Sequence, residues 1–140
     1  MDGTEVASLG SGWLALALVF AAGLVPLGFR LRTGRRAAPD SGPISLHVSL
    51  GLAVVAAAFV HSVLGVLTLG SERAIGASEL SIWGGVIAVL VLMAHVGVGL
   101  QLRNPKLRER ARLRRWHLAT ALTIAVCAVV HAVLLWIVEV

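Results

Sequence analysis

The chain has 140 residues, of which 58% are hydrophobic and only 14% are charged, and its mean hydropathy is +0.91. Soluble domains hold about 45–50% apolar and about 25% charged residues, so these values exclude an ordinary soluble domain, and the high hydrophobicity excludes a disordered chain. The single cysteine, Cys127, excludes an internal disulfide and a site with several thiolate ligands, and the lack of a Cys-x-x-Cys-His sequence excludes covalent c-type haem attachment.

Four apolar stretches predict four membrane-spanning helices. They cover residues 12–29, 44–69, 80–102 and 116–138. Each has about 18 residues or more, which is enough to cross a bilayer at 1.5 Å per residue. The connections are short and contain helix breakers, such as Pro39. We therefore predict one all-α domain over residues 1–140, a transmembrane four-helix bundle with up-down-up-down topology.

The net charge of +5 is concentrated in two of the connections. Of the twelve Lys and Arg residues, eleven lie in residues 30–36 and 103–115, and only Arg73 lies elsewhere. A basic chain can indicate nucleic-acid binding, but the positive-inside rule explains this pattern without a nucleic-acid partner. The rule places loops 30–43 and 103–115 in the cytoplasm and both termini outside. We thus expect a multi-pass protein of the inner (plasma) membrane, surrounded by the lipid bilayer.

All five histidines lie inside the predicted spans, and four of them share one spacing. His47 and His61 are 14 residues apart, and so are His117 and His131. On a helix, 14 residues turn about 1400°, roughly 40° short of four full turns, and rise about 21 Å. Both spans run from the cytoplasm outward, so the four rings are predicted to form two pairs at matched depths. His47 pairs with His117 near the inner side, and His61 pairs with His131 near the outer side.

Two imidazoles that face each other across a helix bundle are the axial ligand set of a six-coordinate haem iron. The spacing therefore predicts two haem b groups, the inner held by His47 and His117 and the outer by His61 and His131. Histidines in a membrane also bridge helices by hydrogen bonds. If all of them did only this, the chain would be a non-redox structural anchor subunit.

Glycines and the fifth histidine give weaker signals. Gly51 and Gly65 each follow a histidine by four residues, and Gly85 and Gly99 are also 14 residues apart. These four glycines predict either clearance for a porphyrin or close helix packing. His95 has no partner at this spacing; bridging through Ser or Thr is the favoured role, with a propionate contact or a quinone pocket as alternatives. Basic residues near the inner ends are candidates either for haem propionate partners or for topology determinants: Arg30, Arg32, Arg103, Arg114 and Arg115.

The pattern resembles transmembrane b-type cytochromes, in particular the di-haem core of the ferric reductase and NADPH oxidase group and, more distantly, cytochrome b of the bc complexes. The segments Arg115-Trp116-His117-Leu118 and His131-Ala132-Val133-Leu134-Leu135 are similar to the fifth-helix segment of the former group. The resemblance implies a relay of single electrons across the membrane, between a cytoplasmic-side flavoprotein or quinol and an outer-side acceptor. The chain includes neither the flanking helices nor the flavin domain of that group, so a redox partner subunit or quinone is implied.

Overall fold

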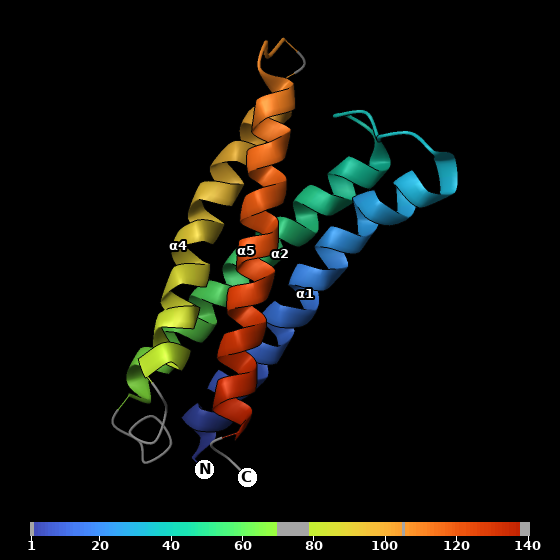
Figure 1. Ribbon diagram of the computed structural model, residues 1–140. Helices are drawn as coiled ribbons and strands as arrows, with labels where there is room; N and C mark the ends of the chain where they lie inside the picture. Colours follow the sequence, from blue (N-terminus) through green and yellow to red (C-terminus); the bar gives the residue numbers. More distant parts are fainter. Residues whose placement is uncertain (1, 70–78, 105, 138–140) are drawn as a thin grey trace.

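The computed structural model describes residues 2–69, 79–104 and 106–137, and in these residues it contains four helices and no strand. The helices are α1 (Gly3–Thr33), α2 (Gly42–Leu67), α4 (Glu79–Leu102) and α5 (Arg110–Ile137) (Figure 1). Each one is long and apolar enough to cross a membrane. The predicted all-α bundle with four membrane spans is therefore confirmed.

Helix α1 extends beyond the predicted span at both ends because its termini are capped. Asp2 and Glu5 form a capping box, in which the Glu5 N–H donates to Asp2 Oδ1 at 2.8 Å and the Asp2 N–H donates to Glu5 Oε2 at 3.0 Å. At the other end the helix stops at Gly34, which adopts φ = 67°, a left-handed conformation that glycine tolerates without strain. The span predicted for residues 12–29 is thus the central part of a longer helix.

The other boundaries differ by smaller amounts. Helix α5 begins at Arg110 rather than at residue 116, because part of the basic connection is helical. The Arg110 guanidinium donates hydrogen bonds to the carbonyls of Leu102 and Asn104, and so ties the start of α5 to the end of α4. Helix α2 ends at Leu67, two residues before the predicted boundary. Residue 138, the predicted end of the last span, and Arg73 lie outside the described residues.

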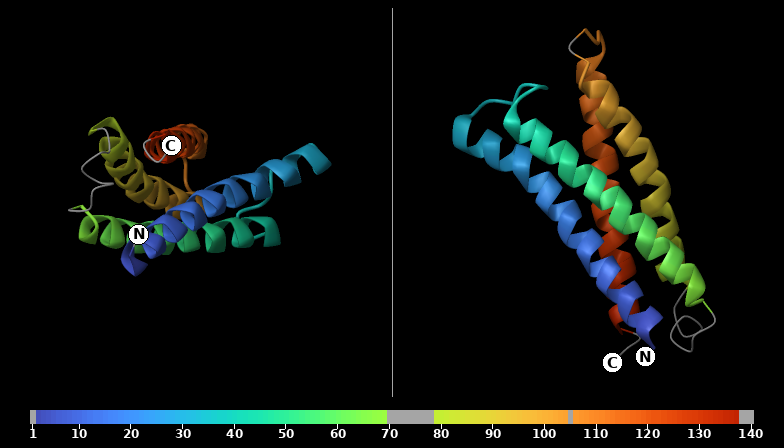
Figure 2. Two further views of the ribbon diagram at one scale, coloured as in Figure 1. Left: turned by 90° about the horizontal axis from the view of Figure 1, so that it is seen from below. Right: turned by 180° about the vertical axis from the view of Figure 1, so that it is seen from behind.

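The four helices form two antiparallel hairpins, α1–α2 and α4–α5 (Figures 1 and 2). The two helices of each hairpin pack closely, whereas the hairpins contact each other less extensively. A small apolar core joins them: Val54 of α2, Leu92 of α4 and Ile124 of α5 are buried together, with Leu18 and Val19 of α1 packed against them. Figure 2 shows the hairpins diverging toward the end that carries the α1–α2 connection.

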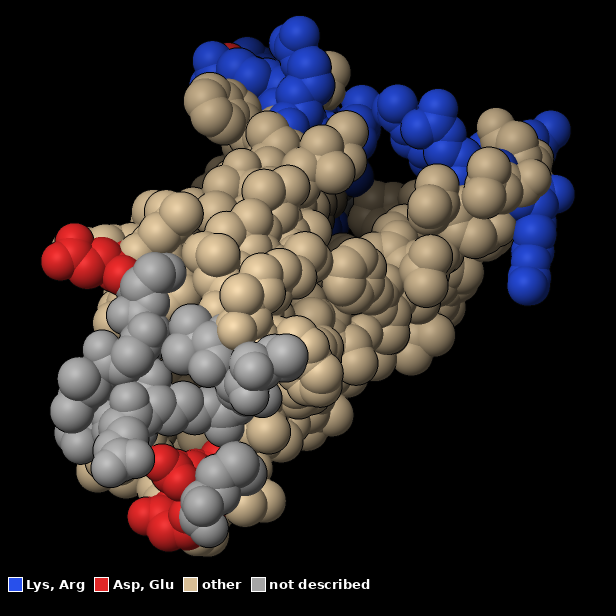
Figure 3. Space-filling model, turned by 60° about the horizontal axis from the view of Figure 1, so that its bottom comes forward, with Lys and Arg blue, Asp and Glu red and all other residues tan. Residues whose placement is uncertain are grey.

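The surface is that of a membrane protein. Large apolar side chains point outward from the helices, such as Leu31 (77% exposed) and Phe59 (69% exposed). Lys and Arg gather at one end of the bundle (Figure 3), which we call the basic end and which carries residues 30–36, 103–104 and 106–115. At the opposite end, which we call the acidic end, α1 and α4 begin with acidic residues, Glu5 and Glu79 respectively. The described basic side chains are thus concentrated at one end of the bundle, as in proteins that cross a bilayer.

Candidate functional site

The structure brings four histidines together as two pairs between the hairpins. The ring centroids of His47 and His117 lie 6.0 Å apart with an angle of 84° between the ring planes. Those of His61 and His131 lie 5.9 Å apart with an angle of 72°. We call them the basic-end pair and the acidic-end pair. The pairing predicted from the spacing of 14 residues is therefore present, and each pair takes one ring from α2 and one from α5.

The apolar core separates the two pairs. Val54 lies seven residues from both histidines of α2, and Ile124 lies seven residues from both histidines of α5. Both side chains are nearly inaccessible, with 4% and 5% exposed. Seven residues are about two helical turns, so the core occupies a level midway between the pairs. Each pair thus lies in its own half of the bundle.

In the first hairpin, carbonyls of α1 hold both histidines of α2. His47 Nδ1 lies 2.8 Å from the Ala22 carbonyl oxygen, and His61 Nδ1 lies 2.9 Å from that of Ser8. A carbonyl only accepts, so each Nδ1 must be the protonated nitrogen. The lone pair is therefore on Nε2, the tautomer that metal-binding histidines adopt when a carbonyl orients them.

Proline explains why the Ala22 carbonyl is available. In an α-helix the carbonyl of residue 22 accepts from the N–H of residue 26, but residue 26 is Pro26, which has no N–H. The freed carbonyl would be an unsatisfied polar group in an apolar surrounding. The hydrogen bond from His47 removes this cost and fixes the ring at the same time.

At the other two carbonyl contacts a glycine lies one turn beyond the acceptor. A Cβ on Gly12 would lie 2.9 Å from Cε1 of His61, whose acceptor is the Ser8 carbonyl. In the second hairpin, His131 Nδ1 lies 2.6 Å from the Ser81 carbonyl, and a Cβ on Gly85 would lie 3.1 Å from Cε1 of His131. The missing side chain at the glycine therefore lets the imidazole reach the backbone of the neighbouring helix.

These contacts reveal an interval of 14 residues in α1 and α4 as well. In α1 the acceptors Ser8 and Ala22 are 14 residues apart, as are Gly12 and Pro26. In α4 the same interval separates Gly85 from Gly99, and a Cβ on Gly99 would lie 3.1 Å from Cε1 of His117. Sequence reasoning did not identify Ser8, Ala22, Gly12 or Pro26. Their spacing, matched to that of the histidines, is the signal that could have found them.

The four glycines proposed from sequence separate into two groups. Gly85 and Gly99 lie against the imidazoles of α5, so the space they leave is used by the histidine rings themselves. Gly51 and Gly65 have open space where a side chain would begin. Clearance for a cofactor thus stays a prediction for these two, whereas Gly85 and Gly99 permit close packing of histidine on helix.

His95 bridges two helices, as the favoured sequence interpretation predicted. His95 Nδ1 lies 2.8 Å from the Thr120 hydroxyl oxygen on α5. That hydroxyl has its own acceptors in the carbonyls of Trp116 (2.9 Å) and His117 (3.0 Å), so it accepts from His95. The His95 ring also stacks on that of His117, with centroids 3.8 Å apart and planes 14° apart.

Each histidine pair offers two imidazoles in the part of the chain that the structure describes. Among the described residues no group of three or more His, Cys, Asp and Glu side chains is placed to hold one. A protein-bound Zn²⁺ ion takes three or four protein ligands, and each pair offers two imidazoles. The donor set fits a metal that brings its remaining ligands with it, as haem iron does.

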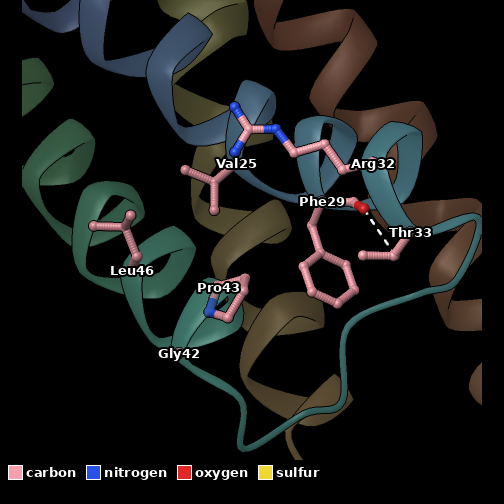
Figure 4. A pocket seen from close by; sticks show the side chains of 7 residues that line it. All are labelled: Val25, Phe29, Arg32, Thr33, Gly42, Pro43 and Leu46. Atoms are coloured by element: carbon pink, nitrogen blue, oxygen red, sulfur yellow. Dashed lines mark hydrogen bonds between the residues drawn. The ribbon is translucent and has the colours of Figure 1, made fainter.

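The basic residues considered as propionate partners are exposed at the basic end. Arg32 lines a hollow between α1 and α2, which Val25, Phe29 and Leu46 also line (Figure 4). Thr33 closes one side, and its hydroxyl donates to the Phe29 carbonyl at 2.9 Å. This hollow lies beside the connection between α1 and α2. The pairing of the basic residues with a propionate stays a prediction.

Searches of protein-family models, of curated proteins and of solved structures found no match to this chain.

Proposed function

We propose that the chain is a membrane b-type cytochrome that binds two haem groups and relays single electrons between the two faces of the membrane. The observation on which this proposal rests is the geometry of the basic-end and acidic-end pairs. Imidazole nitrogens lie about 2.0 Å from a bound transition metal, which places the centroids of two rings on opposite sides of one metal about 6–6.5 Å apart. The measured separations are 6.0 Å and 5.9 Å.

The hydrogen bonds of the rings also support the proposal. Three of the four paired histidines use Nδ1 to bond a backbone carbonyl, which leaves Nε2 as the basic nitrogen. A hydrogen bond from the second nitrogen is the usual support of a metal-ligating histidine, because it orients the ring and raises its basicity. In this proposal His47 and His117 hold one haem, and His61 and His131 hold the other. Haem iron supplies the ability to take up and release one electron at a time.

The chain's own residues then determine what the site does. Each pair would hold its haem through two imidazoles, and a group held in this way would supply electron transfer. The core around Val54 and Ile124 places apolar side chains in the region between the pairs. The helical rise of about 21 Å between His47 and His61 distributes the two pairs across the bilayer.

Charge gives the proposed orientation. The positive-inside rule places the basic end in the cytoplasm, and both ends of the chain then lie outside. In the inner membrane, the basic-end pair would then receive electrons from a donor on the cytoplasmic side, either a flavoprotein or a quinol. The acidic-end pair would face an outer acceptor.

One set of observations favours a different function, that of a structural anchor without redox activity. His47, His61 and His131 each bond a carbonyl of a neighbouring helix, and His95 bonds Thr120, so all four already join helices. An anchor would need only these Nδ1 contacts. It would not require that the rings of α2 and α5 face each other at both levels.

A spectrum distinguishes the two functions. The full chain, expressed in a haem-competent host and purified in detergent, is expected to show a b-type α-band in its reduced-minus-oxidised difference spectrum. The haem extracted into pyridine should amount to two groups per chain. A folded, monodisperse preparation without haem would refute the cytochrome and favour the anchor.

Proline 26 provides a test of how His47 is held. Pro26→Ala adds an N–H that bonds the Ala22 carbonyl and competes with His47. We expect the helix to become more stable, by at most about 3 kcal/mol, while haem at the basic-end pair is retained less well. Stability is measured by thermal unfolding and retention by haem content after dilution in detergent.

The matched control is Pro43→Ala. Pro43 lies in the first turn of α2, where a missing N–H leaves no carbonyl without its partner. Haem content should be unchanged in this variant. Equal haem retention in both variants would show that the carbonyl of Ala22 is not needed to hold the ring.

A further inference from the structure

His117 differs from the other three paired histidines in what holds its ring. The other rings bond carbonyls through Nδ1, but His117 Nδ1 is buried and forms no hydrogen bond with any described residue. His131 bonds the carbonyl of Ser81, and His117 lies 14 residues before His131 on α5. Since α4 runs antiparallel to α5, the residue of α4 at the corresponding level is 14 residues after Ser81, which is His95. The carbonyl of His95 forms no hydrogen bond with His117 Nδ1 in the structure.

The contact that His117 does make is with the side chain of the same residue. The His95 imidazole lies face to face with that of His117 at 3.8 Å, and the two planes are 14° apart. At the equivalent position of the first hairpin, facing His47, the chain has Ala22, which has no ring to offer. The two hairpins thus differ at this position, because α4 places an imidazole against the basic-end pair where α1 has a methyl group.

The His95 ring is itself fixed. Its Nδ1–H donates to Thr120, and the Thr120 hydroxyl donates to carbonyls of its own helix. Thr120 is on α5, less than one turn beyond His117. The residue that anchors the His95 ring and the ring on which His95 stacks therefore belong to the same helix. The contacts from α5 through Thr120 and His95 back to His117 restrict rotation of the His117 ring about its bond to Cβ.

We propose that His95 is a positioning residue for His117, which orients the ligand ring by stacking where the other three ligands are oriented by a carbonyl. This role rests on the proposed function. A ligand without an acceptor at Nδ1 is a weaker electron donor than one that has such an acceptor, since the hydrogen bond raises ligand basicity. The two pairs are therefore inequivalent even though both consist of two imidazoles.

Three substitutions in the full chain separate the contributions. His95→Leu removes the aromatic face, His95→Phe keeps a flat ring but loses the bond to Thr120, and Thr120→Val removes that bond while His95 remains. Each is made in the wild-type chain and also in His61→Ala, in which only the basic-end haem should remain. The readouts are the low-temperature EPR spectrum of the oxidised protein, which reports ring orientation, and a potentiometric titration.

We expect His95→Leu to broaden and shift the EPR signal of the basic-end haem and to change its midpoint potential. His95→Phe should restore most of the wild-type signal, and Thr120→Val should give a smaller change than His95→Leu. The acidic-end haem should be unaffected in all three. His95→Leu could lose the basic-end haem altogether. In that case the positioning role of His95 is still tested by whether His95→Phe retains this haem and by whether Thr120→Val shifts its EPR signal.

Unchanged signals in His95→Leu or in Thr120→Val would overturn the proposal. The backbone carbonyl of residue 95 is present in every variant, so that result would assign the orientation of His117 to this carbonyl. Failure of the proposed function gives a different result, because the wild-type chain would then bind no haem.

Discussion

Replacing His61 with alanine is expected to leave one haem per chain in place of two. His61 is one ring of the acidic-end pair, and its partner His131 is 5.9 Å away by ring centroids. Without His61, the acidic-end pair would keep only the imidazole of His131 to hold a haem. The basic-end pair lies on the other side of the apolar core and should be retained.

The pairing itself gives the sharper prediction. His131→Ala should produce the same spectrum as His61→Ala, because each removes one ligand of the same haem. His47→Ala and His117→Ala should share a second, different spectrum. The measurement is haem content per chain together with the α-band of the reduced protein at low temperature.

Ser62→Ala is the matched control for His61. Ser62 is the next residue along α2, and its hydroxyl donates to the Ala58 carbonyl of its own helix at 2.8 Å. This variant should keep both haems. Four histidine variants with four different spectra, or a variant of one pair that loses only the haem of the other, would show the assignment of ligands to be wrong.

The second large effect is expected from adding a single methyl group at Gly12. Its Cβ would lie 2.9 Å from Cε1 of His61, closer than Cβ atoms approach other atoms in proteins, and 3.1 Å from Nδ1, which is a tight contact. The ring has to move away from α1, and it then loses the bond to the Ser8 carbonyl. Loss of an outer-shell partner typically weakens metal binding by about 10–100-fold, and we expect a decrease of this order for haem at the acidic-end pair.

Gly10→Ala provides the comparison because it lies on the same helix with nothing within 4 Å of its Cβ position. Both variants gain helix propensity, about 1 kcal/mol for glycine to alanine in a helix interior. Gly10→Ala should therefore be at least as stable as wild type and keep both haems. Gly12→Ala should be deficient in the acidic-end haem alone, as measured by haem content and retention in detergent. Equal haem retention in the two variants would mean that the hydrogen bond from His61 to the Ser8 carbonyl of α1 is not needed to hold the haem.

The positions of the helices and the placement of the two histidines on one face of each helix could be predicted from sequence because both depend on local properties. A run of about 20 apolar residues is long enough to span a bilayer whatever surrounds it. An interval of 14 residues places His47 and His61 on nearly one face through the geometry of the α-helix alone. The helix ends were less accurate, since α1 depends on the cap at Asp2 and α5 on the contacts of Arg110.

What holds each ring was decided only by the tertiary structure, because it depends on which residues of different helices come within hydrogen-bonding distance. His47 is 25 residues from the Ala22 carbonyl, and His61 is 53 residues from that of Ser8. These distances in the chain become contacts only when α1 lies antiparallel against α2 in one register. The stacking of His95 on His117 likewise requires α4 to pack on α5 at a fixed rotation. The composition of the chain determined that it forms membrane helices, whereas the packing of those helices determined how each imidazole is oriented.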